Sequence, residues 1–188
     1  MENKQKKLFT LVFVFDDDKQ RLLLGLKKRG FGLGKYNGFG GKVEGNESIV
    51  DAAVRELNEE CGLSVRDSNA LTFAGINYFD FIGHPIVFEV HVFKIRFSDV
   101  DGTVTESNEM KPQWYSYDEI PFDRMWPDDR YWFPSLFKTY VKFTGRYVFE
   151  SIESDVLVEE NLVEEGNDAT VLKSRNTNVE CISVKDNN

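Results

Sequence analysis

Residues 41–63 of the chain, GKVEGNESIVDAAVRELNEECGL, carry the pattern that decides the fold. Its first part belongs to a stretch, residues 30–45, that holds seven glycines and predicts a loop whose backbone can approach a ligand closely. From Ser48 onward an apolar residue recurs every three or four positions, which predicts a helix. Ser48 and Asp51 can cap its start, and Gly62 is placed to end it. The segment therefore predicts a glycine-rich loop that leads into an amphipathic helix.

Three acids share one face of this predicted helix. Glu56, Glu59 and Glu60 stand at positions i, i+3 and i+4, opposite the apolar stripe. Like charges at this spacing cost roughly 0.2–0.5 kcal/mol per pair in an isolated helix. A solvated charged face is the simplest explanation, but Mg²⁺ prefers carboxylate oxygens and commonly bridges protein acids to phosphates. Because a bound cation would offset the repulsion, we expect a divalent metal site on this face.

Nine residues of the segment match the signature Gly-x5-Glu-x7-Arg-Glu-U-x-Glu-Glu-x-Gly-U, in which U is a bulky aliphatic residue. They are Gly41, Glu47, Arg55, Glu56, Leu57, Glu59, Glu60, Gly62 and Leu63. The chain thus resembles the Nudix hydrolases. The resemblance implies an α/β fold, an α/β/α sandwich with a central mixed sheet. It also implies metal-dependent hydrolysis of a nucleoside diphosphate linked to another group, with Mg²⁺ as the cofactor and Mn²⁺ as an alternative.

The resemblance assigns roles around the metal. The implied ligands are Gly40, Glu56, Glu59, Glu60 and Glu109, with Gly40 contributing its carbonyl. Glu60, Glu56 and Glu109 are the expected catalytic residues, and Glu60 is expected to orient or deprotonate the attacking water. Glu109 lies outside the helix, where a lone loop glutamate would usually face solvent.

Two further signature residues are expected to support these ligands. Arg55 stands four residues before Glu59 and is placed to orient that carboxylate. Glu47 belongs to the same charged surroundings. Neither is expected to touch the substrate.

Stretches outside the signature carry a closer resemblance, from about residue 8 to residue 150. They include LLLGLKKRGFG at 22–32, NGFGGKV at 37–43, VHVF at 90–93, ESNEM at 106–110 and PFDRMWPDDRYWFP at 121–134. They are similar to the Nudix enzymes that hydrolyse oxidised purine nucleoside triphosphates, such as 8-oxo-dGTP and 2-hydroxy-dATP. The implied products are the monophosphate and pyrophosphate, and the implied role is to clear damaged nucleotides from the pool.

This closer resemblance implies a pocket for the base. Asn37 is expected to hydrogen-bond the base, Trp126 to stack on it, and Asp128 with Asp129 to read its Watson–Crick edge. Two adjacent carboxylates would share a proton, because like charges at close range raise one pKa. The pair would then offer one donor and one acceptor, which suits either purine type. The other expected substrate contacts are Thr10, Lys27, Phe39, Gly40, Gly41, Lys42, Phe79 and Pro127.

Simpler roles also fit several of these residues. Asp128 and Asp129 are placed to cap a helix, and Trp126 and Phe79 are residues typical of a core. The alternative functions are a Nudix hydrolase of another nucleotide (a methylated purine triphosphate, an ordinary dNTP or a dinucleoside polyphosphate) and a Nudix module that binds nucleotides without catalysis. The intact glutamate face argues against the second, since a binding module does not need a repulsive metal face.

The rest of the chain predicts the domain organisation. Apolar or alternating runs predict strands at 8–15, 21–27, 75–81, 85–97, 114–117 and 143–149. A second helix is expected from residue 128 or 129 to about 140, although Pro134 would strain it. We therefore expect one mixed α/β domain over residues 1–150. Residues 151–188, which are acidic and then rich in Ser, Asn and Lys, have the composition of a disordered tail.

Charge and cysteine content restrict the remaining classes of function. The formal net charge is −9, but eight acids lie between positions 150 and 168, so the body of the chain is nearly neutral. Such a body is compatible with an anionic ligand that metal ions bridge, and it does not indicate a surface that binds nucleic acid. The two cysteines lie far apart, and no apolar run is long enough to span a membrane. We expect a cytoplasmic monomer, with the nuclear or mitochondrial nucleotide pool as alternative locations. We expect it to bind a small-molecule purine nucleoside triphosphate and neither nucleic acid nor a membrane.

Overall fold

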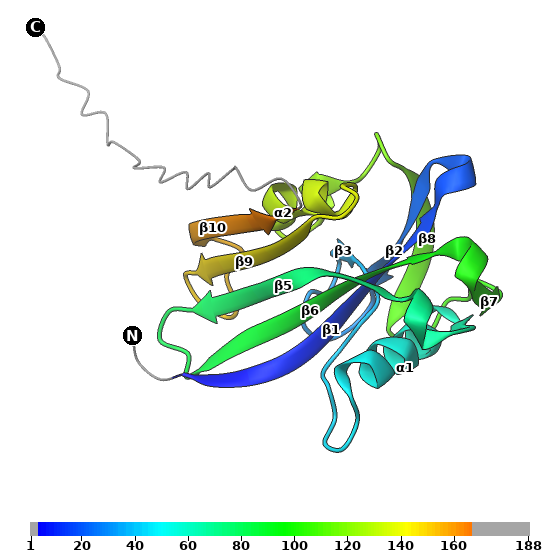
Figure 1. Ribbon diagram of the computed structural model, residues 1–188. Coiled ribbons are helices and arrows are strands. Elements are labelled where there is room, and N and C mark those ends of the chain that lie inside the picture. Colours follow the sequence, from blue (N-terminus) through cyan, green and yellow to red (C-terminus); the bar gives the residue numbers. More distant parts are fainter. Residues whose placement is uncertain (1–3, 167–188) are drawn as a thin grey trace, which may run out of the picture.

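The computed structural model describes residues 4–166, which form an eight-stranded mixed sheet with one helix on each side (Figure 1). The strand order is β10-β9-β5-β6-β1-β2-β3, and β8 pairs with β2. The pairs β1·β6 and β5·β9 are parallel, and the others are antiparallel. The strands are β1 (Gln5–Asp16), β2 (Arg21–Lys27), β3 (Tyr36–Asn37), β5 (Thr72–Phe81), β6 (Ile86–Arg96), β8 (Met110–Ser116), β9 (Lys142–Phe149) and β10 (Leu157–Glu165).

Smaller elements complete the described part of the chain. A separate two-stranded sheet pairs β4 with β7. None of the helices within residues 4–166 has both the length and the hydropathy that a membrane span requires. These elements are α1 (Ile49–Cys61), α2 (Asp129–Leu136), β4 (Leu63–Val65), β7 (Val100–Gly102) and 3₁₀ turns at Asp17–Lys19, Ser68–Ala70, Phe97–Asp99 and Phe122–Arg124.

Alternation along β1 explains why the sheet is covered on both faces. Successive side chains of a strand point to opposite faces, and every residue from Val12 to Phe15 is buried. Phe13 and Phe15 belong to the core that contains α2, whereas Val12 and Val14 belong to the core that contains α1. The α/β/α arrangement expected from the sequence is therefore confirmed.

The first helix begins and ends as its sequence predicts. The Ser48 side chain accepts a hydrogen bond from the Asp51 N–H (3.1 Å), while the Asp51 carboxylate accepts one from the Ser48 N–H (3.4 Å). Gly62 adopts a left-handed conformation with φ 76° and donates its N–H to the Asn58 carbonyl. The helix is thus fixed at both ends, so the face that carries its acids has a defined direction.

The second helix is shorter than the sequence predicts. It ends at Leu136, and the following N–H groups of Phe137 and Lys138 bond to carbonyls only three residues back. Pro134 explains the early end, because its ring removes one donor and clashes with the preceding turn. The six predicted strands are all present, with ends that differ by a few residues, whereas β3, β4 and β7 were not predicted.

The strand β10 lies in the segment that the sequence analysis assigned to a disordered tail. It pairs antiparallel with β9 along its length, and its Leu157 and Leu162 pack against the core on the α2 side. The prediction of disorder from residue 151, and of a domain that ends at 150, is therefore wrong for residues 151–166. An edge strand needs apolar residues on one face only. The many acids of β10 therefore gave this segment the composition of a disordered tail although it forms a strand. The rest of the predicted tail lies outside the described residues.

Candidate active site

Two adjoining cavities open beside the glycine-rich loop. One, of about 680 Å³, lies next to α2 and is lined mainly by aromatic and aliphatic side chains; we call it the apolar pocket. The other, of about 930 Å³, lies next to α1 and is lined mainly by charged side chains; we call it the acidic pocket. The two share the lining residues Lys27, Arg29, Gly40, Gly41 and Glu109. One ligand with an apolar end and an anionic end can therefore occupy both.

The acidic pocket collects the four carboxylates that the sequence places near a metal. Glu56, Glu59 and Glu60 come from α1, and Glu109 comes from the loop before β8. The Lys28 N–H donates to the Glu109 carbonyl at 2.7 Å, which ties that loop to the end of β2. Residues separated by about fifty positions thus face one cavity.

Cations of the chain itself hold these carboxylates. Lys27 Nζ lies 2.9 Å from Glu60 Oε1 and 3.1 Å from Glu109 Oε2, and Arg29 also pairs with Glu109. Within residues 4–166, no three acidic, histidine or cysteine side chains stand close enough together to hold a metal ion as they are. The carboxylates must therefore turn away from these cations before they can share an ion.

Arg55 neutralises the other two helix acids. Its Nη1 lies 2.9 Å from Glu56 Oε1 and 3.1 Å from Glu59 Oε2. Its Nε and Nη2 donate hydrogen bonds to the two carboxylate oxygens of Glu47, at 3.0 and 2.7 Å. Nη2 also donates to the Lys42 carbonyl. The Glu47 pair with Arg55 fixes the arginine to the loop, which is the geometry that a supporting role requires.

The glycines of the loop fit the donor set of a hard divalent cation. A Cβ at Gly41 would lie only 2.4 Å from Glu56 Oε1, so the missing side chain makes room for that carboxylate. The Gly40 N–H donates to Glu60 Oε2 at 2.8 Å. The carbonyls of Phe39 and Gly41 bond back to β1, and in an extended segment the N–H and C=O of one residue point to the same side. The Gly40 backbone thus lies beside the carboxylates, and a carbonyl oxygen is a donor of the kind that suits Mg²⁺.

Burial and neighbouring charges set the pKa values of these acids in opposite directions. Burial raises the pKa of Glu60 although Lys27 opposes it, and burial raises the pKa of Glu56 against Arg55. The Glu109 pKa is lowered, first by its hydrogen bond to Arg29 and then by Lys27. Burial lowers the Lys27 pKa, but its hydrogen bonds and charge pairs with Glu60 and Glu109 outweigh burial and raise it. Glu56 and Glu60 are therefore better proton acceptors than Glu109.

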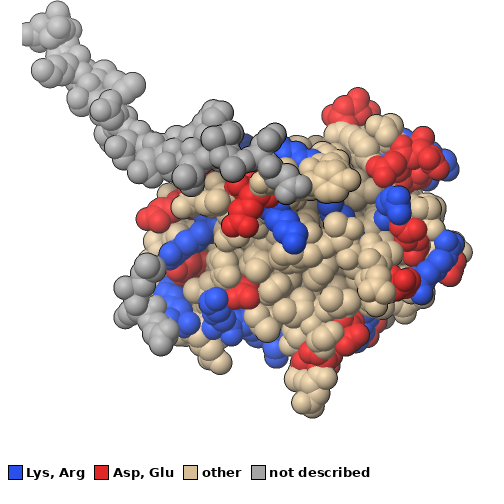
Figure 2. Space-filling view, in the orientation of Figure 1, with Lys and Arg blue, Asp and Glu red and all other residues tan. Residues whose placement is uncertain are grey.

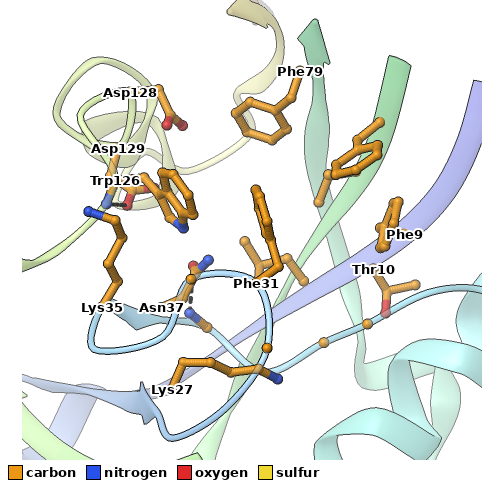
Figure 3. Close-up of a pocket in the computed structure, with 18 of the residues that line it drawn as sticks. Phe9, Thr10, Lys27, Phe31, Lys35, Asn37, Phe79, Trp126, Asp128 and Asp129 are labelled. Carbon is orange, nitrogen blue, oxygen red and sulfur yellow. Dashed lines mark hydrogen bonds between the residues drawn. The ribbon is translucent and has the colours of Figure 1, made fainter. Parts of the chain in front are cut away.

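The apolar pocket has a floor of sheet residues and a wall around α2 (Figure 3). Phe79 of β5 lines the floor and stacks on the buried Tyr147, with ring centroids 5.7 Å apart. Trp126 stacks on Phe31 of the glycine-rich loop at 4.9 Å with an angle of 20° between the rings. Phe31 is 53% exposed, so this aromatic pair reaches the pocket mouth. Flat apolar surfaces on several sides suit a planar ring.

Two buried carboxyls lie in the wall of this pocket. Asp128 and Asp129 are 1% and 2% exposed. Asp128 Oδ2 accepts from Trp132 Nε1 and Asp129 Oδ2 accepts from the Trp126 N–H, each at 2.9 Å. Asp128 stands at the N-cap of α2 without a side-chain capping bond, so capping does not explain it.

The electrostatics of this aspartate pair favour a shared proton. Burial raises the pKa of Asp128, with the Trp132 hydrogen bond and the Lys35 charge opposing it. Burial also raises the pKa of Asp129, and the neighbouring Asp128 charge raises it further. One carboxyl that keeps its proton beside one that loses it presents a donor and an acceptor together.

Two polar side chains, those of Asn37 in β3 and Thr10 in β1, also line the apolar pocket (Figure 3). Asn37 Oδ1 accepts the Gly38 N–H at 2.8 Å, which leaves the amide Nδ2 for another partner. The Thr10 hydroxyl is buried and has no hydrogen-bond partner within the part of the chain that the structure describes. A buried hydroxyl without a partner is costly, which makes Thr10 a good candidate for a ligand contact.

Not every expected substrate contact lies in a cavity. Phe39, an expected substrate contact, is fully buried in the core around α1, and it lines neither pocket. It pairs with Val12, whose side chain belongs to the same core. Pro127 also lines neither pocket, whereas Lys42 lines the acidic pocket.

Several of the lining residues are not predicted from the sequence, among them Arg29, Lys35 and Ile152. Arg29 lines both pockets, and Lys35 and Ile152 line the apolar pocket. Lys35 is a lone lysine in a loop, and no local sequence pattern marks it as a pocket residue. Ile152 lies in the segment predicted to be a tail, and it reaches the apolar pocket because the chain turns back after β9.

Comparison with known proteins identifies the architecture. The profile of the NUDIX domain matches residues 6–136, which is more than half of the chain. The chain belongs to the Nudix family. Its segment 41–63 is the Nudix signature, and α1 with the preceding loop is the Nudix loop and helix.

Two curated relatives are similar over most of this Nudix chain. It is 49% identical to the "Oxidized purine nucleoside triphosphate hydrolase" of Mus musculus over 158 residues, which is 84% of this chain and 95% of the relative. The protein of the same name from Danio rerio is 48% identical over the same shares. An alignment of 158 residues must extend past residue 150, so the relatives also match the start of the segment that was taken for a tail.

A solved structure confirms the fold. The MutT protein from Bacillus halodurans superposes with a TM-score of 0.70 at 24% identity, covering 83% of this chain and 97% of that protein. The MutT Nudix hydrolase from Burkholderia pseudomallei gives a TM-score of 0.54 at 22% identity and covers 63% of this chain.

Proposed function

We propose that this Nudix protein hydrolyses oxidised purine nucleoside triphosphates such as 8-oxo-dGTP and 2-hydroxy-dATP to the monophosphate and pyrophosphate. The observation that carries the proposal is the continuity of the two pockets through Lys27, Gly40 and Glu109. A purine fits the apolar pocket beside the buried aspartates, and its triphosphate then reaches the acidic pocket. The names of the mouse and zebrafish relatives support this substrate class.

Base selection is assigned to the aspartate pair. With one proton between them, Asp128 and Asp129 offer a donor and an acceptor to either damaged purine edge. Asn37 and Thr10 contribute from the floor, and Trp126 supplies the stacking surface. Asp129→Asn replaces a carboxyl that can gain or lose a proton by an amide that cannot, so the pair can no longer share a proton. The variant should therefore change the ratio of kcat/KM between 8-oxo-dGTP and 2-hydroxy-dATP. An unchanged ratio would contradict this assignment.

The acidic pocket is assigned to the cofactor and the reaction. Glu56, Glu59, Glu60, Glu109 and the Gly40 carbonyl would hold Mg²⁺, with Mn²⁺ as an alternative. Bound there, the ion would lower the pKa of the attacking water and neutralise phosphate charge. Glu60, whose pKa burial raises, accepts the proton of the attacking water.

The cations around the acidic pocket would change partners as the substrate binds. Lys27, once released from Glu60 and Glu109, is placed to pair with the phosphates at the junction of the pockets. Arg55 continues to orient the helix carboxylates through Glu47. Both roles follow from contacts that these residues already make.

The deciding experiment is hydrolysis of 8-oxo-dGTP and of dGTP in ¹⁸O-water, with Mg²⁺ or with a chelator. We expect Mg²⁺-stimulated turnover that favours the oxidised nucleotide, with the label in pyrophosphate, as attack at the β-phosphorus requires. Glu60→Gln should lower kcat by about 10²–10⁴-fold, the usual contribution of a general base. Label in the monophosphate would contradict attack at the β-phosphorus. The absence of Mg²⁺-stimulated pyrophosphate release from any purine nucleotide, or equal turnover by Glu60→Gln, would refute the catalytic proposal.

We also propose that the protein acts as a monomer in the cytoplasm. Both pockets are complete within one chain, and Cys61 is a buried free thiol, as suits a reducing compartment. Light scattering on the purified chain and localisation of a tagged chain test the two statements separately.

A further inference from the structure

The turn between β9 and β10 forms part of the apolar pocket. The Glu150 N–H donates to the Val156 carbonyl at 3.0 Å, and the Ser154 hydroxyl donates to Glu150 at 3.0 Å, so the turn is closed on itself. Ile152 lines the pocket and packs against the adjacent core. The turn thus has a defined place beside the base-binding wall.

One ion pair connects this turn to the glycine-rich loop across the chain. Lys35 Nζ lies 2.6 Å from Asp155 Oδ2. The Lys35 backbone is fixed as well, because its N–H donates to the Gly32 carbonyl and its carbonyl accepts from the Lys27 N–H. Asp155 is 58% exposed and does not line the pocket, whereas the Lys35 side chain is 21% exposed and does.

The same lysine holds the aromatic ring assigned to stacking. Its Nζ lies over the Trp126 ring, 4.9 Å from the centroid, a distance at which a cation is attracted to the ring face. In Figure 3, Lys35 and Phe31 lie on opposite sides of Trp126. The indole therefore has the ammonium group on one side and the Phe31 ring on the other, so a purine that stacks on Trp126 must take the place of Phe31.

Lys35 also acts on the neighbouring carboxyls. Its positive charge opposes the burial that raises the pKa values of Asp128 and Asp129. A lysine in this place thus touches both parts of the base-binding wall, the stacking ring by contact and the aspartate pair through charge.

We propose that Lys35 is a positioning residue for base recognition and that Asp155 holds it in place. The proposal rests on the proposed function, in which the purine stacks on Trp126. A ring whose orientation is fixed before the base arrives loses less freedom on binding, so affinity improves without a new contact to the base. Asp155 acts only through Lys35.

The test compares steady-state kinetics of four variants of the full chain on 8-oxo-dGTP and 2-hydroxy-dATP. Asp155→Asn frees the lysine, and Lys35→Met removes the charge but keeps the length. We expect each to raise KM roughly two- to fivefold with kcat unchanged, as the loss of an exposed ion pair and a cation–π contact implies. Lys35→Arg keeps both interactions and should behave as wild type.

Asp101→Asn is the matched control. It breaks an exposed ion pair with Arg66 of similar length, 2.8 Å, on the small β4–β7 sheet. It should leave KM unchanged. Lys35→Met alone should also alter the preference between the two substrates, because only this variant removes the charge beside the aspartates.

The outcomes are distinct. Wild-type KM values for Asp155→Asn and Lys35→Met, a lower kcat at constant KM, or an equal rise in KM for Asp101→Asn each overturn the proposal. Equilibrium titration with the nucleotides in the absence of divalent metal gives a second measurement: weaker binding by the two variants supports the proposal and equal binding overturns it. If wild type binds these nucleotides but does not hydrolyse them, the catalytic proposal fails while the titration still decides the role of Lys35.

Discussion

At the residue scale, Asp129 shows how a residue proposed to recognise the base can oppose stability. It is buried beside a second carboxyl, and burial raises its pKa well above the ordinary value of 3.8. The folded state therefore holds a proton that the unfolded chain releases. The resulting contribution to stability is fully present below about pH 4 and is lost as pH rises through the folded-state pKa.

This loss of stability with rising pH leads to a prediction for Asp129→Asn. The amide cannot ionise, yet its oxygen can still accept the Trp126 N–H. We expect the variant to have a larger free energy of unfolding than wild type at pH 8, with a difference that shrinks toward pH 4. Urea unfolding at several pH values measures it, and a variant less stable than wild type at pH 8 would contradict it.

At the element scale, the Nudix loop contains two glycines, Gly40 and Gly41, at which an added methyl group would meet different neighbours. A Cβ at Gly41 meets the Glu56 carboxylate, which can turn away. A Cβ at Gly40 would lie 2.0 Å from the Thr10 carbonyl of β1, which belongs to the sheet and cannot turn. A side chain at position 41 would therefore disturb the carboxylates proposed to bind the metal. A side chain at position 40 would disturb the packing of the loop against β1.

Gly41→Ala should weaken metal binding by about 10–100-fold, the usual effect of disturbing a group that orients a ligand. Its melting temperature should stay close to that of wild type. Gly40→Ala should instead lower the free energy of unfolding by about 1–3 kcal/mol, as overpacking does. Mn²⁺ titration and thermal unfolding of both variants separate the two effects, and the same response from both would contradict the distinction.

The edge strand β10 contributes to stability through one face. Leu162 packs against the core, and the next residue, Val163, points the other way and is 37% exposed. We expect Leu162→Ala to cost about 1–3 kcal/mol, at the lower end for a leucine that is only partly buried. Val163→Ala is the control and should cost less than about 0.5 kcal/mol. Equal costs in denaturant unfolding would argue that β10 does not pack as described.

At the scale of the whole molecule, local patterns were predictable and distant pairings were not. The capped helix α1 and six strands follow from short-range periodicity, because caps and alternation are set within a few residues. The position of β10 depends on pairing with β9, and its acidic outer residues hide the half-buried face. The short strands β4 and β7 exist only because they pair with each other across the chain, and β3 is only two residues long and carries no alternating pattern.

The residues of the candidate site also divide into those that local spacing predicts and those that it does not. The cluster of Glu56, Glu59 and Glu60 follows from helical spacing, whereas Glu109 was placed by resemblance alone. Resemblance also named Phe39, but the direction of a side chain depends on strand register, and that side chain faces the other core. Lys35 and Asp155 are 120 positions apart in the chain, so no local pattern predicts their contact.

The lysine at the junction of the two pockets has a thermodynamic consequence for the whole molecule. Lys27 bridges Glu60 and Glu109. Under the proposed function, a cation that took over those carboxylates would free the ammonium group for an incoming phosphate chain, so each ligand would prepare the place of the other. Such heterotropic linkage is reciprocal: the factor by which Mg²⁺ would tighten nucleotide binding must equal the factor by which nucleotide would tighten Mg²⁺ binding.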